Sequence, residues 1–278
     1  MVVEKNYFYT IALGDKNNIG VPRPLSGDLE QNFKIAAEIG YDAVELHNIK
    51  NPNTININDL NRLCKKYSIG ISAISTGLSN YIDKLSLIDD SKKIRIAAIE
   101  RVKEYIRLAG YLNCYVIIGT VRGNIPDLSN YKYYEKRLLD SIKFLSEQLI
   151  NSNAILLIEI ANRYESNYLN TAEEISNFID KVNIPNLKMM LDTFHMNIEE
   201  ANICLSIEKH YKKLGYFHVA DSNRLYPGAG HIDFKLILST LKKINYKGFI
   251  GLECLPLPDG ITAAKVSIKF LKRFLETP

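Results

Sequence analysis

Short apolar runs alternate along the chain with longer segments in which apolar residues recur every three or four positions. The runs are rich in β-branched and aromatic residues, a pattern typical of strands that are buried on both faces of a parallel sheet. We predict eight strands, at residues Tyr7–Leu13, Ala43–His47, Ile71–Ser75, Tyr115–Gly119, Ile155–Ile160, Lys188–Asp192, Tyr216–Ala220 and Phe249–Glu253.

Start and stop signals mark several of the amphipathic segments as helices. Asp28 is a predicted N-cap for a helix that ends near Gly40, Thr171 opens a capping box, and Asp233 caps a third helix. Neither Gly14 nor Gly20 makes a glycine-rich phosphate loop after the first strand. Eight strand–helix alternations therefore favour a single-domain (β/α)8 barrel of the α/β class, spanning residues 1–278, over a doubly wound sheet.

The charge and hydropathy of the chain argue against nucleic-acid and membrane partners. The chain has 35 Lys and Arg against 31 Asp and Glu, a formal net charge of +4. Its lysine pairs fall in predicted helices, where solvated faces explain them better than a nucleic-acid surface. No long apolar run follows Met1–Lys5, and no run is long enough to cross a bilayer, so we expect no signal peptide, no membrane partner and a cytoplasmic protein.

The number and spacing of the cysteines indicate a protein from a reducing compartment. They are widely spaced and form no CxxC pair, so the sequence supports neither a disulfide framework nor a zinc knuckle. They are Cys64, Cys114, Cys204 and Cys254.

The last four predicted strands each end in one ionisable residue after an apolar run, and these residues are Glu159, Asp192, His218 and Glu253. Taken singly, each is explained by a solvated rim position, a salt bridge or a hydrogen-bonded core histidine. Together they would meet at the carboxyl end of a barrel, where three carboxylates repel one another. A divalent cation relieves that repulsion, and an oxygen-rich set without thiolate favours Mn²⁺, Mg²⁺ or Co²⁺ over structural zinc.

Further polar residues follow these strand ends. Glu165, His195 and Arg224 lie in the loops after the strands that end in Glu159, Asp192 and His218. Arg122 follows the fourth strand, where it is either a surface arginine or a contact for an anionic group of a ligand. Glu45 and His47 alternate on the second strand, for which supporting or structural roles are at least as good an interpretation as direct ligation.

Three segments resemble those of a known superfamily. IEIANRYE at 158–165, LDTFHMNIEE at 191–200 and HVADSNR at 218–224 look like the xylose isomerase-like TIM barrels, and most of all like the ketose 3-epimerases, which include D-tagatose and D-psicose 3-epimerases and related keto-sugar-acid epimerases. The resemblance is dense from residue 155 onwards and looser before about residue 125.

This resemblance implies specific roles. Glu159, Asp192, His218 and Glu253 would hold one divalent ion, with Mn²⁺ favoured and Mg²⁺ or Co²⁺ as alternatives. Glu165, His195 and Arg224 would hold a small sugar substrate, and the protein would form a dimer or tetramer. The implied reaction inverts C3 of a ketose or keto-sugar acid through a cis-enediolate, with Glu159 and Glu253 as the acid and base. The chain departs from several relatives in having no Trp.

Three other functions remain open at this point. An aldose–ketose isomerase similar to hydroxypyruvate isomerases would use the same metal site and an enediolate. An abasic-site endonuclease would need several metals on many histidines, but only His195 and His218 of the five histidines stand in motif positions. A non-catalytic sugar-binding barrel is the third alternative. The four ligand candidates argue against it, because a binding protein does not need carboxylates beside a reactive carbon.

Overall fold

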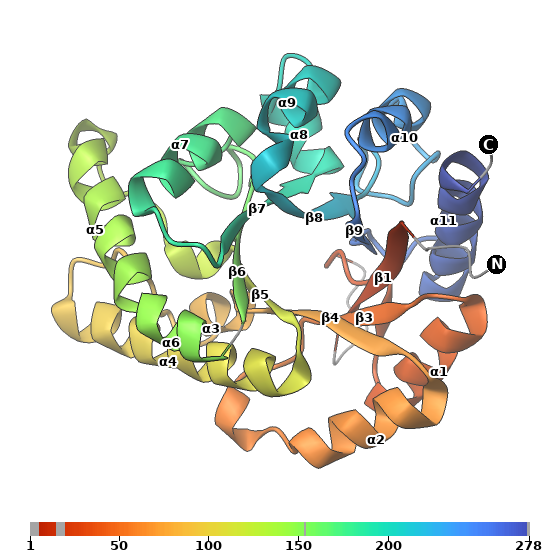
Figure 1. Ribbon diagram of the computed structural model, residues 1–278, viewed down its shortest axis with the longest axis horizontal. Coiled ribbons are helices and arrows are strands. Elements are labelled where there is room, and N and C mark those ends of the chain that lie inside the picture. The colour runs from red at the N-terminus through yellow and green to blue at the C-terminus, as the bar shows by residue number, and fades with distance from the viewer. Residues whose placement is uncertain (1–5, 15–19, 153, 277–278) are drawn as a thin grey trace.

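The alternating strands and helices of the sequence build a closed, all-parallel sheet in the computed structural model (Figure 1), which describes residues 6–14, 20–152 and 154–276. Residues 1–5, on which the expectation of no signal peptide rests, lie outside the described residues. Seven parallel pairings run in chain order from β1 to β9, and β1 also pairs with β9, which closes the barrel. The strands are β1 (Tyr7–Gly14), β3 (Ala43–Leu46), β4 (Gly70–Ser75), β5 (Tyr115–Ile118), β6 (Ile155–Glu159), β7 (Leu187–Asp192), β8 (Leu214–Val219) and β9 (Gly248–Leu252).

These eight strands confirm the predicted barrel. Each observed boundary lies within two residues of its predicted position, and some strands end before the predicted residue because buried residues continue past the last ladder pairing. Ala220, for example, is buried but lies beyond the end of β8. A further strand, β2 (Leu25–Ser26), was not predicted because two residues carry no periodicity, and it pairs only with β1.

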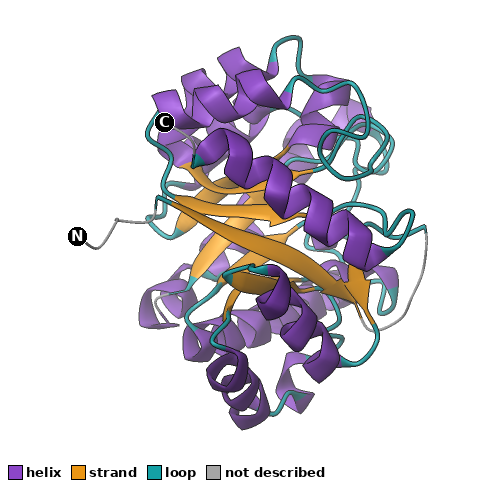
Figure 2. Ribbon diagram, turned by 90° about the vertical axis from the view of Figure 1, so that its right-hand side faces the viewer, coloured by secondary structure: helices purple, strands orange, loops and turns teal. Residues whose placement is uncertain are grey.

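Helices surround the barrel, and Figure 2 shows the strands enclosed between them. The helices that cover the barrel or follow a strand end are α1 (Leu29–Ile39), α2 (Ile57–Tyr67), α3 (Gly77–Tyr81), α4 (Lys92–Leu112), α5 (Tyr131–Phe144), α6 (Ser146–Ser152), α7 (Ala172–Val182), α8 (Thr193–Glu199), α9 (Ile203–His210), α10 (Phe234–Lys243) and α11 (Gly260–Leu275). Short 3₁₀ segments occur at Pro52–Thr54, Thr120–Arg122, Leu128–Asn130 and Tyr211–Lys213.

The predicted caps form as expected. Asp28 Oδ1 accepts from the backbone N–H of Gln31 over 2.8 Å, and α1 ends at Gly40 with φ of 100°. Thr171 and Glu174 make the full capping box that starts α7. Asp233 caps α10 by accepting from the Leu236 N–H at 3.0 Å.

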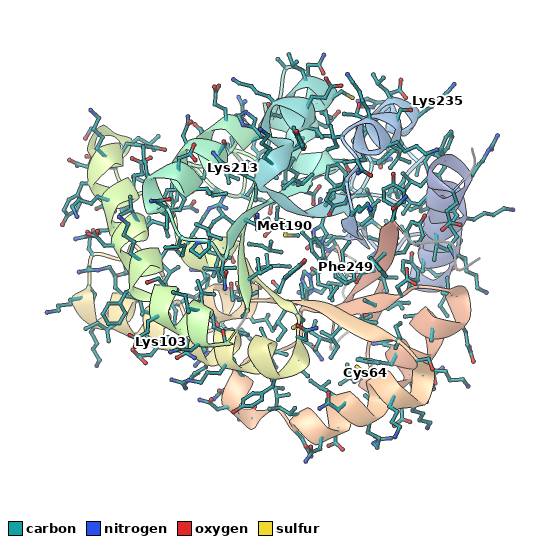
Figure 3. The ribbon with its side chains drawn as sticks, viewed as in Figure 1. Cys64, Lys103, Met190, Lys213, Lys235 and Phe249 are labelled. Atoms are coloured by element: carbon teal, nitrogen blue, oxygen red, sulfur yellow. The ribbon has the colours of Figure 1, made fainter. Side chains whose placement is uncertain are left out.

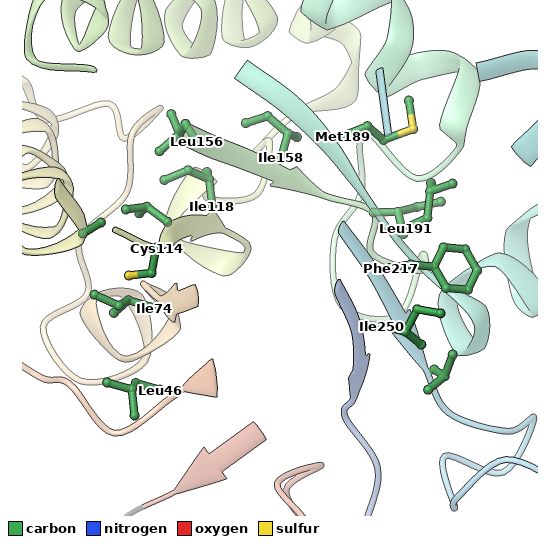
Figure 4. Close-up of a cluster of buried hydrophobic side chains, with 14 of the residues drawn as sticks. Leu46, Ile74, Cys114, Ile118, Leu156, Ile158, Met189, Leu191, Phe217 and Ile250 are labelled. Carbon is green, nitrogen blue, oxygen red and sulfur yellow. The ribbon is translucent and has the colours of Figure 1, made fainter. Parts of the chain in front are cut away.

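Two hydrophobic layers stabilise the barrel. The larger layer lies between strands and helices, and Figure 4 shows part of it, including Ile158, Leu191 and Phe217. The smaller layer fills the inside of the barrel with Ala73, Ile117, Leu157, Met190 and Tyr216. In Figure 3, Met190 and Phe249 lie near the centre of the molecule, whereas Lys235 lies near its edge. Each fully buried aliphatic or aromatic side chain contributes about 1.5–3 kcal/mol to folding.

The two-residue period of a strand places the ionisable residues. Because successive side chains face opposite sides, a residue two positions after an inward residue also faces inward. Leu157, Met190 and Tyr216 fill the inner layer, so Glu159, Asp192 and His218 lie one step higher on the same inward face. The sequence thus builds an apolar floor with polar groups above it.

Two further expectations concern cysteines and membranes. All four cysteines are free, as the sequence predicts, and Cys114 and Cys254 are buried. Within the described ranges, no helix combines the length and apolar character needed to cross a bilayer.

Candidate active site

A cavity of the described structure lies at the carboxyl ends of the strands, where barrel enzymes place their chemistry. Its volume is about 540 Å³. Side chains from the second half of the barrel line one part of it, and polar side chains from the segments after β4 and β5 line the other. The first group includes Glu159, Glu165, His195, Arg224 and Glu253, and the second includes Ser75, Asn80, Lys84, Ser86, Thr120 and Asn124.

Three of the four predicted metal ligands lie close together, and two of them, Glu159 and Glu253, line this cavity. Glu159, His218 and Glu253 each offer one ligand atom, and these atoms all lie within 4.8 Å of one another. Glycines make room for them. A Cβ at Gly119 would collide with Glu159 Oε2, and a Cβ at Gly251 would lie 2.7 Å from His218 Cδ2. The backbone therefore approaches the cluster more closely than any other residue type would allow.

Asp192 lies beside this group, and a buried arginine connects it to Glu253. Arg224 Nη1 donates to Asp192 Oδ2 over 2.6 Å, and Arg224 Nη2 donates to Glu253 Oε2. The Arg224 guanidinium also lies 4.7 Å from the centre of the Phe194 ring. Arg224 adopts φ of 61°, a conformation that non-glycine residues adopt rarely, at a turn closed by its N–H to the Asp221 carbonyl.

The three carboxyl groups have different electrostatic environments. Burial, together with the charge of Glu253, raises the pKa of Glu159 to about 8. Burial also acts to raise the pKa of Asp192, but the Arg224 guanidinium and the nearby histidines outweigh it and bring that pKa to about 2. The pKa of Glu253 is lowered, because Arg224 and His218 offset its burial. Glu159 is thus the carboxyl that most needs a cation to ionise.

The donor set around His218 fits a divalent ion. Its Nε2 pairs with Glu45 Oε2 at 2.8 Å, while its Nδ1 is buried and has no hydrogen-bond partner among the described residues. Nδ1 lies 3.5 Å from Glu253 Oε2 and 3.8 Å from Asp192 Oδ2. An orphaned ring nitrogen facing carboxylate oxygens is the arrangement expected of a metal ligand, since buried polar atoms are rarely left without a partner.

The three predicted substrate contacts also reach this cavity. His195 is 2% exposed, and its Nδ1 accepts from the backbone N–H of Asn162 at 3.2 Å, with Asn162 Nδ2 at 2.8 Å. These donors hold the ring with its proton on Nε2, which lies 3.9 Å from Asp192 Oδ2. Burial lowers the pKa of His195, which keeps the ring neutral. The side chain of Glu165 is 50% exposed at the cavity rim, and its Oε1 accepts from Asn162 Nδ2 at 3.2 Å.

Arg122 is not the surface arginine that its loop position suggested. It is 1% exposed, Nη1 donates to the carbonyl of Glu159, and Nη2 donates to the carbonyl of Tyr168 over 3.4 Å. Nε has no partner among the described residues. The guanidinium therefore holds the end of β6 in place, and Arg122 is also one of the residues that line the cavity. Direct contact with an anionic group of a ligand stays a prediction.

Sequence reasoning assigned no definite role to two residues that belong to the site. Glu45 is fully buried beneath the cluster, and its second oxygen, Oε1, pairs with His47 Nε2. His47 lines the cavity, and its Nδ1 lies 3.8 Å from Glu253 Oε1. The signal for Glu45 is present in the sequence, because Val44 and Leu46 face the outer core and leave the residue between them facing inward.

Comparison with known proteins identifies the family to which this fold belongs. Residues 33–274 match the family described as xylose isomerase-like TIM barrel. The chain is 30% identical over 232 residues to the L-ribulose 3-epimerase of Mesorhizobium japonicum, covering 81% of this chain and 75% of that protein. It is 24% identical over 246 residues to the 3-dehydro-D-guloside 4-epimerase of Escherichia coli, covering 87% of this chain and 91% of that protein.

A match over part of the chain and a solved structure also relate this protein to sugar epimerases. The D-psicose 3-epimerase of Enterocloster bolteae is 36% identical over 132 residues, which is 48% of this chain and 44% of that protein. The crystal structure of D-allulose 3-epimerase from Methylomonas sp. in complex with D-allulose superimposes with a TM-score of 0.82 at 23% identity, covering 97% and 98% of the two chains. That structure shows the shared fold. The chain belongs to the xylose isomerase-like TIM barrel family, and it is an enzyme of the isomerase class.

Proposed function

We propose that this protein is a metal-dependent epimerase that inverts C3 of a ketose or keto-sugar acid through a cis-enediolate. The observation that carries the proposal is the meeting of Glu159 and Glu253 with the orphaned Nδ1 of His218 at the mouth of the barrel. The L-ribulose 3-epimerase and the 4-epimerase of a 3-dehydro-glycoside among the relatives support this class of reaction.

The proposed ligands are Glu159, Asp192, His218 and Glu253. Asp192 would join the other three by exchanging its pairing with Arg224 for the cation. A divalent ion at this place would supply Lewis acidity toward the carbonyl of the sugar, which makes the neighbouring C–H more acidic. We propose Mn²⁺, with Mg²⁺ and Co²⁺ as alternatives, because carboxylate oxygens and one imidazole suit all three ions.

Inversion at a carbon needs a base on one face and an acid on the other. We assign these roles to Glu159 and Glu253, which come from β6 and from the residue after β9. One carboxylate takes the C3 proton, the C–H electrons form the C2–C3 double bond, and the carbonyl oxygen gains the charge. The other carboxyl then donates a proton to the opposite face of C3, the electrons of the C2–C3 double bond form the new C–H bond, and the charge on the oxygen re-forms the C2 carbonyl. The direction of the reaction decides which glutamate begins.

The neighbouring cationic and neutral donors stabilise the charged intermediate. Arg224 carries a permanent charge beside Asp192 and Glu253, and it would oppose the negative charge on the enediolate. The Nε2–H of neutral His195 would donate to a substrate oxygen, and Glu165 at the rim would accept from a hydroxyl group. The wall formed by Asn80, Ser86 and Asn124 offers hydrogen bonds to the rest of the sugar.

A product assay distinguishes this function from its competitors. Ketohexoses, ketopentoses, ketose phosphates and keto-sugar acids would be incubated with enzyme that has been stripped by chelation and reloaded with Mn²⁺, Mg²⁺ or Co²⁺. We expect C3 epimers, formed only by the reloaded enzyme. Aldose products would instead identify an aldose–ketose isomerase, and metal-independent sugar binding without turnover would identify a binding protein. Cleavage of DNA at abasic sites would identify an endonuclease.

The remaining parts of the proposal concern the setting of the enzyme. We propose that it acts in the cytoplasm on a free small molecule, as a homo-oligomer, without a nucleic-acid or membrane partner. Light scattering coupled to size-exclusion chromatography tests the oligomeric state, and a monomer at micromolar concentration would contradict it.

A further inference from the structure

Beneath the proposed metal site, a chain of buried hydroxyl and carboxyl groups runs through the inside of the barrel. Thr10 Oγ1 lies 2.7 Å from Ser72 Oγ, and Ser72 Oγ lies 2.8 Å from the Tyr216 hydroxyl. That hydroxyl donates to Glu45 Oε2 at 2.7 Å, and the same oxygen pairs with His218 Nε2 at 2.8 Å. The contacts join four strands, β1, β4, β8 and β3, and all five residues are at most 1% exposed.

We infer that Glu45 is the positioning residue of the metal site: it accepts the Nε2–H of His218 and thereby commits Nδ1 of that ring to the cation. This inference rests on the metal site proposed above. Glu45 itself offers no ligand atom to the group formed by Glu159, His218 and Glu253. It acts through the imidazole, as a carboxylate that fixes which ring nitrogen carries the proton and how the ring is oriented.

The surroundings of Glu45 explain why a carboxylate is needed there. A buried carboxylate is costly unless several donors satisfy it, and Glu45 receives three, from Tyr216, His218 and His47. Two of these partners are histidines that both lie near Glu253. His218 Nδ1 is 3.5 Å from Glu253 Oε2, and His47 Nδ1 is 3.8 Å from Glu253 Oε1. One carboxylate therefore organises both rings that face Glu253.

A purely structural role makes a different prediction. If Glu45 only stabilised the barrel, its loss would lower thermal stability without changing the affinity of the folded protein for a cation. Thr10 provides the matched comparison, because it belongs to the same buried chain but lies at the end farthest from His218, beyond Ser72.

Metal titration of Glu45→Gln, Thr10→Val and the unchanged protein tests the inference. Each chelator-stripped protein would be titrated with Mn²⁺, with folding checked by circular dichroism. We expect the unchanged protein to bind one equivalent, Thr10→Val to bind within twofold of it, and Glu45→Gln to bind about 10–100-fold more weakly. Binding by Glu45→Gln as tight as that of the unchanged protein would overturn the role of Glu45. Failure of the unchanged protein to bind would instead overturn the metal site itself.

A second measurement needs no variant, in case Glu45→Gln does not fold. In protein saturated with Mg²⁺ and labelled with ¹⁵N in its histidines, we expect His218 to keep its proton on Nε2 and to show an unprotonated Nδ1. A proton on Nδ1, with Nε2 free for the ion, would overturn the inference because Nε2 faces Glu45.

Discussion

Arg224 Nη1 lies 2.6 Å from Asp192 Oδ2, in a part of the barrel where both side chains are almost fully buried. The guanidinium also donates to Glu253. Arg224 therefore joins the end of β7 to the residue that follows β9, and it places a permanent positive charge in contact with Glu253. Burial acts to lower the pKa of Arg224, but the two carboxylates outweigh it and raise that pKa, so the charge persists at all physiological pH values.

Replacement of this arginine separates catalysis from metal binding. Arg224→Ala removes the charge that opposes the enediolate, and we expect turnover to fall by on the order of 10²–10³-fold, as for other lost electrostatic donors. Metal content should stay near one equivalent. The control is Arg62→Ala, which changes an exposed pair with Glu30 on the outer helices. Near-normal turnover of Arg224→Ala would remove this residue from the mechanism.

Asp192→Asn tests the fourth ligand. The substitution keeps the shape of the side chain but removes its negative charge, so we expect metal occupancy and activity to fall together. Elemental analysis after desalting measures the occupancy, and Asp180→Asn, at an exposed pair with Lys213, serves as the control. Full metal occupancy in Asp192→Asn would show that Glu159, His218 and Glu253 are enough to bind the metal ion. Asp192 would then have the role of holding Arg224.

Gly119→Ala tests the close approach of the backbone to Glu159. A Cβ at this position collides with Glu159 Oε2, so the carboxylate must move and metal affinity should fall by at least tenfold while the fold persists. Gly77→Ala is the matched control on the same rim, because its Cβ would meet only ordinary contacts at 3.5 and 3.6 Å. Equal metal affinities of the two variants would contradict the proposed position of Glu159.

Replacement of Arg122 distinguishes a contact with an anionic group of the substrate from a purely structural role. If its guanidinium turns toward an anionic group at the distal end of the substrate, Arg122→Ala should lower kcat/KM for keto-sugar acids by more than for neutral ketoses. The predicted difference is about tenfold, because hydrogen bonds to charged groups contribute about 1.5–3 kcal/mol. Equal losses for both substrate classes would contradict the anion contact. They would assign Arg122 to holding the carbonyls of Glu159 and Tyr168.

The strands and the ends of the strands were predictable from the sequence because both follow from local rules. A buried parallel strand needs a continuous apolar run, and Glu159, Asp192 and His218 interrupt three such runs at the point where each strand ends. Caps such as Thr171 are equally local, since the side chain bonds to its own first turn. These signals identified the barrel and the cluster at its mouth.

The roles of residues that depend on partners far away in the sequence were harder to predict from the sequence. The burial of Arg122 depends on the carbonyl of Tyr168, 46 residues away, and no periodicity marks its loop. The pairing of Glu45 with His218 spans 173 residues and depends on barrel closure. The contribution of Asn80 and Lys84 to the cavity wall follows from the path of the segment after β4, which has no fixed pattern.

The fate of the C3 hydrogen tests the central claim most directly. In a single turnover in D₂O, with the product analysed by NMR, proton removal by one glutamate and proton return by the other should place solvent deuterium at C3 of the epimer. The original hydrogen should be lost, because the incoming proton comes from a different carboxyl group. Substantial retention of the original hydrogen at C3, or its transfer to a neighbouring carbon, would contradict epimerisation by two carboxylates.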